Sequence, residues 1–138
     1  MGKEVSIRGA SGRRFVLDSG VFDAEGKLPA ELRALAKDRL FTTYASLVEC
    51  VRDRTRGART RDANIRRSVA EVLSPSASIA LRAYRLFEGL RPLSDDGPGL
   101  ADLYIAAAAL EHNLVVITRD RQDFLVVPEV EFVAAWAA

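Results

Sequence analysis

The stretch GLADLYIAAAALEHNLVVITRDRQDF, residues 99–124, decides the fold because it predicts a helix and a buried strand in direct succession. Residues 100–113 are rich in alanine and indicate a helix that ends at Asn113, and LVVIT, residues 114–118, is typical of a fully buried strand. Asp102 lies in the first turn of the helix, and Asp120 and Asp123 follow the strand. These acids are either structural caps and ion pairs or part of a metal site.

The rest of the chain alternates between predicted strands and predicted helices. Strands are expected at residues 14–20, 40–44, 114–118 and 130–133. Helices are expected at residues 27–39, 46–56, 61–73, 74–90 and 100–113, with a loop over residues 91–99. This order predicts an α/β fold with a mainly parallel central sheet of about four to five strands, flanked by helices on both faces.

Length and composition bound the function. A chain of 138 residues is most simply one domain, expected over residues 14–138 after a flexible leader at residues 1–13. The formal net charge of +1 gives the whole molecule no strong bias toward nucleic acid or membrane. No apolar run approaches the roughly 18 residues of a membrane span. Cys50 and His112 are the only residues of their types, which excludes an internal disulfide and histidine-pair zinc sites and fits a reducing compartment such as the cytoplasm.

Four acids lie at the corresponding edge of the predicted sheet. Asp18 ends the first strand, Glu49 begins the helix after the second, Asp102 begins the alanine-rich helix and Asp120 follows LVVIT. The C-terminal ends of parallel strands share one edge, so these carboxylates are expected to converge.

Each acid also has a structural interpretation. First-turn acids complement the helix dipole, which would explain Glu49 and Asp102, and aspartate is a frequent turn residue, which would explain Asp18 and Asp120. Jointly, converging carboxylates repel one another and are costly to pack without a cation. An all-oxygen site suits Mg²⁺ or Mn²⁺, and such a metal suits phosphodiester hydrolysis.

Four segments, VLDSG, TTYASLVE, ADLYIAAAA and VVITRDRQDF, resemble the successive motifs of PIN-domain ribonucleases, particularly VapC-type toxins of type II toxin–antitoxin systems. The resemblance covers about residues 14–133. It implies a PIN-like fold with Asp18, Glu49, Asp102 and Asp120 as the metal-binding catalytic residues, although in some relatives the acid at Asp123 takes part instead. Ser46 matches a small hydroxyl residue of the family and is assigned to substrate binding. Gly20 departs from the family, where Asn, Ser or Thr is common.

The resemblance implies a Mg²⁺- or Mn²⁺-dependent endoribonuclease that acts on RNA, binds a cognate antitoxin and forms a homodimer. Arginines concentrate between Arg52 and Arg67, which is either a solvated face or a phosphate-binding surface. Arg52 and Arg119 are the candidate substrate contacts, Arg119 for the scissile phosphate. Two alternatives stay open. One is a different metal phosphohydrolase, such as a flap-type DNA nuclease or a small phosphatase. The other is a nuclease-dead module that binds RNA or protein.

Overall fold

A computed structural model describes residues 1–52, 57–90, 97–134 and 136 of the chain. Its centre is a six-stranded, wholly parallel sheet in the order β1-β6-β5-β2-β3-β4. The strands are β1 (Lys3–Glu4), β2 (Phe15–Leu17), β3 (Leu40–Thr43), β4 (Glu71–Leu73), β5 (Val115–Ile117) and β6 (Glu131–Val133). The predicted α/β class and parallel sheet are confirmed, and the sheet has one strand more than the largest number expected.

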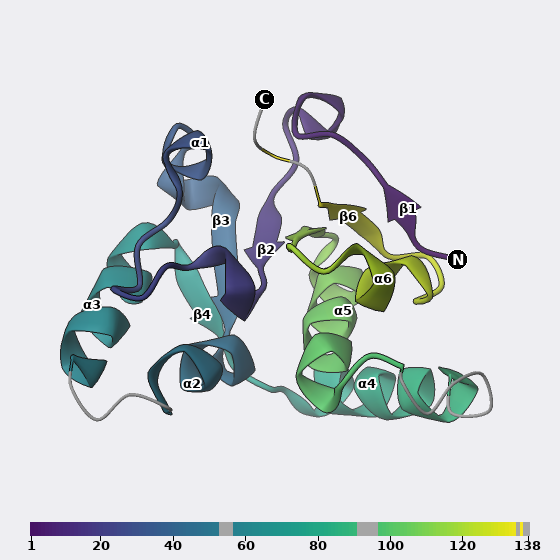
Figure 1. Cartoon of the computed structure of the whole chain (residues 1–138). Coiled ribbons are helices and arrows are strands. Elements are labelled where there is room, and N and C mark those ends of the chain that lie inside the picture. The colour runs from purple at the N-terminus through teal and green to yellow at the C-terminus, as the bar shows by residue number, and fades with distance from the viewer. Residues whose placement is uncertain (53–56, 91–96, 135, 137–138) are drawn as a thin grey trace.

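Helices cover both faces of this sheet (Figure 1). They are α1 (Ala30–Arg33), α2 (Tyr44–Arg52), α3 (Ala58–Ser68), α4 (Ala77–Leu90), α5 (Leu100–His112) and α6 (Arg121–Leu125). Successive strand residues point to opposite faces. Val16 of β2 therefore joins a core with α4, α5 and α6, whereas Phe15 and Leu17 join a second core with α1, α2 and α3.

The alanine-rich helix α5 is buried nearly all round. Ala106–Ala109 are at most 2% exposed, because α5 packs against α4 on one side and against β2, β3 and β5 on the other. A helix with no polar face is expected in such an interior position. The helix ends as predicted at Asn113, which adopts the left-handed conformation (φ 54°).

The predicted helix over residues 61–73 is wrong at its C-terminal end. Helix α3 stops at Ser68, Val69 is extended (φ −124°, ψ 157°), and residues 71–73 form the edge strand β4. The main chain joins β3 through a hydrogen bond from the Ala70 amide to the Leu40 carbonyl (2.7 Å). Val69, Val72 and Leu73 match a helical spacing, but β-branched residues also suit a strand, and pairing with β3 decides between them.

Residues 1–13, expected to be a flexible leader, include a strand of the sheet. Lys3 and Glu4 form β1, which pairs with β6 through bonds such as Lys3 amide to Val130 carbonyl (2.8 Å). An ion pair between Glu4 and Arg121 (2.9 Å) adds a side-chain contact, and Ala10 is buried. The sequence gives no sign of this strand because both of its side chains are exposed and its stabilising contacts come from the main chain.

Two helix boundaries also differ from the predictions. The helix expected over residues 27–39 is only the one-turn α1, followed by a 3₁₀ turn at Lys37–Arg39. Helix α4 begins at Ala77 and not at residue 74, and Ser76 caps it with a hydroxyl that accepts the Ile79 amide (3.2 Å). The end of the helix expected at 46–56 and most of the loop expected at 91–99 lie outside the described residues.

In the described part of the chain, no helix is both long and apolar enough to cross a membrane.

Candidate metal centre

The topology of the sheet brings the predicted acids to one edge. Strand β2 is central, with β3 on one side and β5 on the other, and ligands of open parallel sheets bind at the C-terminal strand ends where the strand order reverses. Asp18 directly follows β2, and Asp120 follows β5. Glu49 lies in α2, which continues from β3 without a loop, and Asp102 lies in the first turn of α5.

Asp18 is the most deeply placed of these acids. It is 7% exposed; one carboxylate oxygen accepts the Ser19 amide (2.8 Å) and the other accepts the Thr118 hydroxyl (2.8 Å). Burial raises the pKa of Asp18 above its ordinary value, and the negative charges of Asp102 and Asp120 raise it further, against the opposing effect of the hydrogen bonds. Asp18, Asp102 and Asp120 are thus close enough to repel one another.

Thr118 links two of the acids and was missed in the sequence. Its fully buried hydroxyl donates to Asp18 and accepts the Asp120 amide (2.9 Å). One side chain therefore fixes Asp18 and the start of the Asp120 turn relative to each other. Threonine is common in strands, so its place at the end of LVVIT carries no signal of this role.

Asp102 and Asp123 belong to the same cluster. The Asp102 carboxylate accepts the Gly99 amide (3.2 Å), so the structural role as a helix cap is real. Burial raises the pKa of Asp102, and the charge of Asp120 adds to this. Burial, together with hydrogen bonds to Asp120 and Asp102 and their negative charges, raises the pKa of Asp123 to about 7. Asp123 therefore takes up a proton near neutral pH and joins the cluster that Asp120 and Asp102 form.

Glu49 approaches the cluster from α2. It is half-buried and lines, together with Asp102, a pocket of about 620 Å³ between α2, α4 and α5. Burial raises the pKa of the Cys50 thiol to about 11, and the charges of Glu49 and Asp18 add to this effect. Glu49 and Asp102 thus line the same pocket, and Glu49 and Asp18 are both close enough to Cys50 to affect the pKa of its thiol.

Ser46 is not placed for substrate contact. It is fully buried, its amide donates to the Thr43 hydroxyl (3.1 Å), and its own hydroxyl accepts from Thr43 (3.1 Å). Thr43 is thus the residue that caps α2. Ser46, predicted to contact substrate, is therefore enclosed at the start of α2, and it is not among the residues that line the pocket.

The donor set fits a hard divalent cation. The acids at this edge supply only oxygen atoms, the preference of Mg²⁺ and Mn²⁺, and their mutual repulsion is what a cation would relieve. Among the described residues, no three such side chains converge closely enough to form a ready metal cage. The carboxylates therefore lie at the same edge of the sheet and influence one another's charge, although they are not arranged as the ligands of one metal ion.

The two predicted arginines lie at the rim of this edge. The Arg119 Nε donates to the Gly20 carbonyl (2.9 Å), and its guanidinium lies 4.9 Å from the centre of the Trp136 ring. Arg52 is exposed and lines the same pocket as Glu49 and Asp102. Gly20 leaves open space, since a Cβ added there would have no neighbouring atom within 4 Å.

Comparison with known proteins identifies this arrangement. Residues 16–130 match the model of the PIN domain. The chain belongs to the PIN domain family. A chain of VapBC-5 from Mycobacterium tuberculosis, a member of the VapBC family of toxin–antitoxin systems, is 30% identical to this PIN domain with a TM-score of 0.63, covering 88% of this chain and 98% of its own. The predicted likeness to VapC-type toxins is confirmed.

Two more distant structures share the fold of this PIN domain. DNA-bound VapBC from Salmonella typhimurium has a TM-score of 0.72 at 19% identity, covering 89% of this chain and 99% of its own. FitAcB from Neisseria gonorrhoeae has a TM-score of 0.68 at 19% identity, with coverage of 86% and 96%. No curated protein sequence matches this PIN domain at a significant level. The family membership makes the chain a nuclease of the toxin–antitoxin type.

The raised pKa of Asp123 predicts how stability depends on pH when metal is absent. This pKa is about 7 in the folded protein against an ordinary value of 3.8, so the folded state binds the proton more tightly than the unfolded state. The stabilising effect of this group is complete below about pH 4 and is lost as the pH rises through about 7. In EDTA, the temperature at the midpoint of thermal unfolding should decrease as the pH is raised from about 5 to about 8.

The variant Asp123→Asn should flatten this fall, since an amide does not titrate. Addition of Mg²⁺ at pH 8 should raise the midpoint of the parent protein more than that of the variant, because a cation binds the ionised cluster. Parallel curves for parent and variant, with and without Mg²⁺, would show that Asp123 titrates independently of the cluster.

Proposed function

We propose that this chain is a Mg²⁺- or Mn²⁺-dependent endoribonuclease and the toxin of a toxin–antitoxin pair. The observation that carries the proposal is the clustering of negative charge at the C-terminal edge of the sheet, where the charges of Asp102 and Asp120 add to burial in raising the pKa of Asp18, and the charge of Asp120 adds to burial in raising the pKa of Asp102. Carboxylates packed in this way are unfavourable unless the protein uses them for a cation. Asp18, Glu49, Asp102 and Asp120 would hold the metal, and Asp123 would join them once it loses its proton.

Each residue has a task that follows from its contacts. A bound metal supplies an attacking water of lowered pKa and neutralises charge on the phosphate. Thr118 holds Asp18 and the Asp120 turn in fixed relation, and the Gly99 amide orients the Asp102 carboxylate. Asp123, with a pKa of about 7, is suited to exchange a proton at neutral pH. Arg119 and Arg52 at the rim supply the positive charge that a phosphate backbone requires.

The test compares three substrates with and without divalent metal. Labelled single-stranded RNA, DNA of the same sequence and a phosphomonoester are incubated in Mg²⁺, Mn²⁺ or EDTA. Internal cleavage of RNA in Mg²⁺ or Mn²⁺, lost in EDTA, is the expected result. Preferred cleavage of DNA or of the monoester would favour another metal phosphohydrolase. Tight binding of RNA in EDTA with no turnover in metal would favour a nuclease-dead module.

The link between Asp18 and Asp120 gives a prediction for Thr118. Thr118→Val keeps the size of the side chain but removes the hydroxyl, which leaves the Asp120 amide and one Asp18 oxygen without this partner. Loss of a residue that orients a metal ligand typically costs about 10–100-fold in metal affinity or activity. Titration with Mn²⁺ and the rate of RNA cleavage measure the effect. Thr118→Ser should recover most of it, and equal losses in Val and Ser variants would point to packing instead.

The proposed partners are a cognate antitoxin and a second copy of the chain. VapBC and FitAcB structures contain toxin–antitoxin complexes, and the pocket beside Asp102 and Glu49, mainly apolar, offers an antitoxin segment access to the site.

A surface for the second copy of the chain is offered by α4. Leu81, Tyr84 and Phe87 are between 41% and 58% exposed, and they are three residues apart on the helix, so their side chains lie on neighbouring parts of its surface and suit a dimer contact. Co-expression with the reading frame directly upstream, followed by sedimentation of the complex and of the toxin alone, tests both. We propose the cytoplasm as the place of action, since an RNA substrate would be available there.

A further inference from the structure

Three neighbouring strands, β6, β5 and β2, end at the edge of the sheet that carries the acids, and a residue after each of them joins one shared contact. These residues are Trp136, Arg119 and Gly20. The Arg119 Nε donates to the Gly20 carbonyl (2.9 Å), and its guanidinium carbon lies over the Trp136 ring, 4.9 Å from the ring centre. The exposed Arg119 side chain is thus held between the segments that follow β2 and β6.

The main chain at Arg119 lies within the acid cluster. Thr118, directly before it, is fully buried and donates its hydroxyl to Asp18 (2.8 Å). Asp120, directly after it, adds to the negative charge near Asp18. Gly20 lies in the 3₁₀ turn that begins directly after Asp18. Both the origin of the Arg119 side chain and its hydrogen-bond partner are therefore fixed next to acids of the proposed metal centre.

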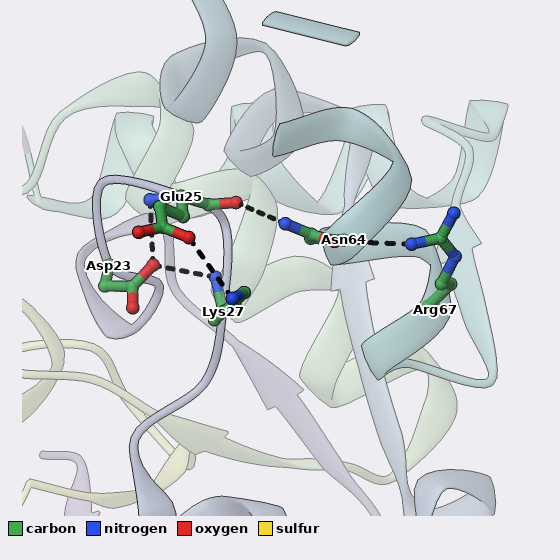
Figure 2. Close-up of polar contacts among 5 residues, drawn as sticks. All are labelled: Asp23, Glu25, Lys27, Asn64 and Arg67. Carbon is green, nitrogen blue, oxygen red and sulfur yellow. Dashed lines mark hydrogen bonds and ion pairs between the residues drawn. The ribbon is translucent and has the colours of Figure 1, made fainter. Parts of the chain in front are cut away.

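The segment that continues from the Gly20 turn is attached to α3, as Figure 2 shows. One Asp23 carboxylate oxygen accepts the amides of Glu25 (2.8 Å) and Lys27 (2.9 Å), which closes a second turn. The Asn64 side chain of α3 then donates to the Glu25 carbonyl (2.8 Å). The Gly20 carbonyl thus belongs to a short segment that is held by the sheet at one end and by α3 at the other, which makes it a fixed acceptor.

Trp136 is fixed by packing. Its side chain is half-buried and packs against the core that contains Phe15, Leu17 and Val133. The face of an indole ring attracts a guanidinium more strongly than that of any other side chain. A long side chain such as arginine loses rotamer freedom when it is ordered, so a contact that orders it in advance lowers the cost of using it to bind a ligand.

The contacts of Arg119 leave most of its hydrogen-bonding groups unused. A guanidinium carries five N–H donors, and the Gly20 carbonyl accepts from one of them. Within the described part of the chain, the two terminal nitrogens of Arg119 form no hydrogen bond and no ion pair. Both of its partners, a carbonyl and an indole, are uncharged. Arg119 therefore keeps the donors and the charge that a phosphate group requires.

We propose that Trp136 is a positioning residue for RNA binding, which acts through Arg119. Together with the Gly20 carbonyl, the indole ring holds the guanidinium at the edge of the metal centre in one orientation, and Arg119 binds a phosphate of the RNA there. This inference rests on the proposed function. It assigns no contact with RNA to Trp136 itself, so the effect of replacing Trp136 should depend on whether Arg119 is present.

The contact can be tested first without RNA. Trp136 is the only tryptophan of the chain, so the tryptophan fluorescence of the protein comes from this ring alone. Arg119→Gln should raise the Stern–Volmer constant for quenching by acrylamide, because it uncovers one side of the ring. Arg67→Gln is the matched control, since Arg67 is exposed on α3 and has its hydrogen bond with Asn64 (3.4 Å). Its quenching constant should equal that of the parent.

The second measurement is a double-mutant cycle on RNA affinity. The probe is a fluorescein-labelled single-stranded oligoribonucleotide, bound in Mg²⁺ to the whole chain carrying Asp102→Asn to prevent cleavage. Arg119→Gln should weaken binding about tenfold and lower the slope of log affinity against log salt by about 0.7. Trp136→Leu should weaken binding about two- to fivefold, as expected for a cation–π contact at an exposed site. In the Arg119→Gln background, Trp136→Leu should have no further effect.

A variant that keeps the aromatic face separates positioning from packing. Trp136→Phe should bind RNA more tightly than Trp136→Leu, because both fill space with an apolar side chain but only phenylalanine offers a ring to the guanidinium. Equal losses for Phe and Leu, or the same loss from Trp136→Leu with and without Arg119, would overturn the proposal. An unchanged quenching constant in Arg119→Gln would overturn it as well. Should Trp136→Leu fail to fold, the quenching result and the cycle repeated with Trp136→Phe decide.

Failure of the proposed function gives a different result. If the parent protein does not cleave RNA in Mg²⁺ or Mn²⁺, the proposed nuclease activity is refuted, whatever the quenching experiment shows. If the parent cleaves RNA but the effects of Trp136→Leu and Arg119→Gln on affinity are independent of each other, only the positioning role of Trp136 is refuted.

Discussion

Asp102→Asn should abolish metal-dependent RNA cleavage while the protein keeps its fold. The amide retains an oxygen that can accept the Gly99 amide, so the cap of α5 survives. It loses the charge that binds a cation and that raises the pKa of Asp18. Removal of a repelling charge should leave thermal stability in EDTA equal to the parent or higher. The loss of activity should exceed the roughly 100-fold cost of losing a residue that only supports a metal ligand.

The measurement combines the rate of RNA cleavage with a titration of Mn²⁺, and Asp38→Asn serves as the matched control because Asp38 is exposed in a 3₁₀ turn. Both activity and metal affinity should fall in Asp102→Asn, and both should stay at the parental level in Asp38→Asn. Cleavage at the parental rate by Asp102→Asn would show that the acids at this edge are structural. Lost activity with unchanged metal affinity would show that Asp102 takes part in a step other than metal binding.

The strands that could be predicted from the sequence are those whose burial requires a continuous run of apolar residues. Strands β2 and β5 are covered on both faces, so FVL and VVI read as continuous apolar runs. The same logic placed Asp18 and Asp120 at one edge, because both follow such strands. Strand β1 could not be found in this way, since Lys3 and Glu4 are exposed and the strand is held by its main chain.

The features that were missed depend on distant partners. Thr118 acts through a contact with Asp18, 100 positions earlier in the chain, and nothing near Thr118 indicates this. Arg61 looked like one of many surface arginines, but it is buried, and the Gly26 turn packs closely against its main chain. Asp123 remained undecided because its relation to Asp102 depends on α6, a helix that the sequence did not predict.

Helix α6 gives the prediction with the largest effect on stability. Its five residues are too few to form a stable helix alone, so tertiary packing must hold it in place. Phe124 supplies that packing: it is fully buried, its ring centre lies 6.5 Å from that of Phe132, and it belongs to the core under β5 and β6. Phe124→Ala should lower the free energy of unfolding by about 3–5 kcal/mol.

Urea denaturation measures this change, and Val126→Ala, at a position 38% exposed just after the same helix, should stay within about 0.5 kcal/mol of the parent. A loss below about 1 kcal/mol in Phe124→Ala would mean that α6 is held by other contacts. Two acids, Asp120 and Asp123, precede Phe124 in this segment, so the consequence extends to the site. At temperatures where the Phe124→Ala protein is still folded, a loosened α6 should lower the pKa of Asp123 toward its ordinary value and weaken Mn²⁺ binding. The burial of Asp123, and its hydrogen bonds to Asp120 and Asp102, raise this pKa and require α6 in place.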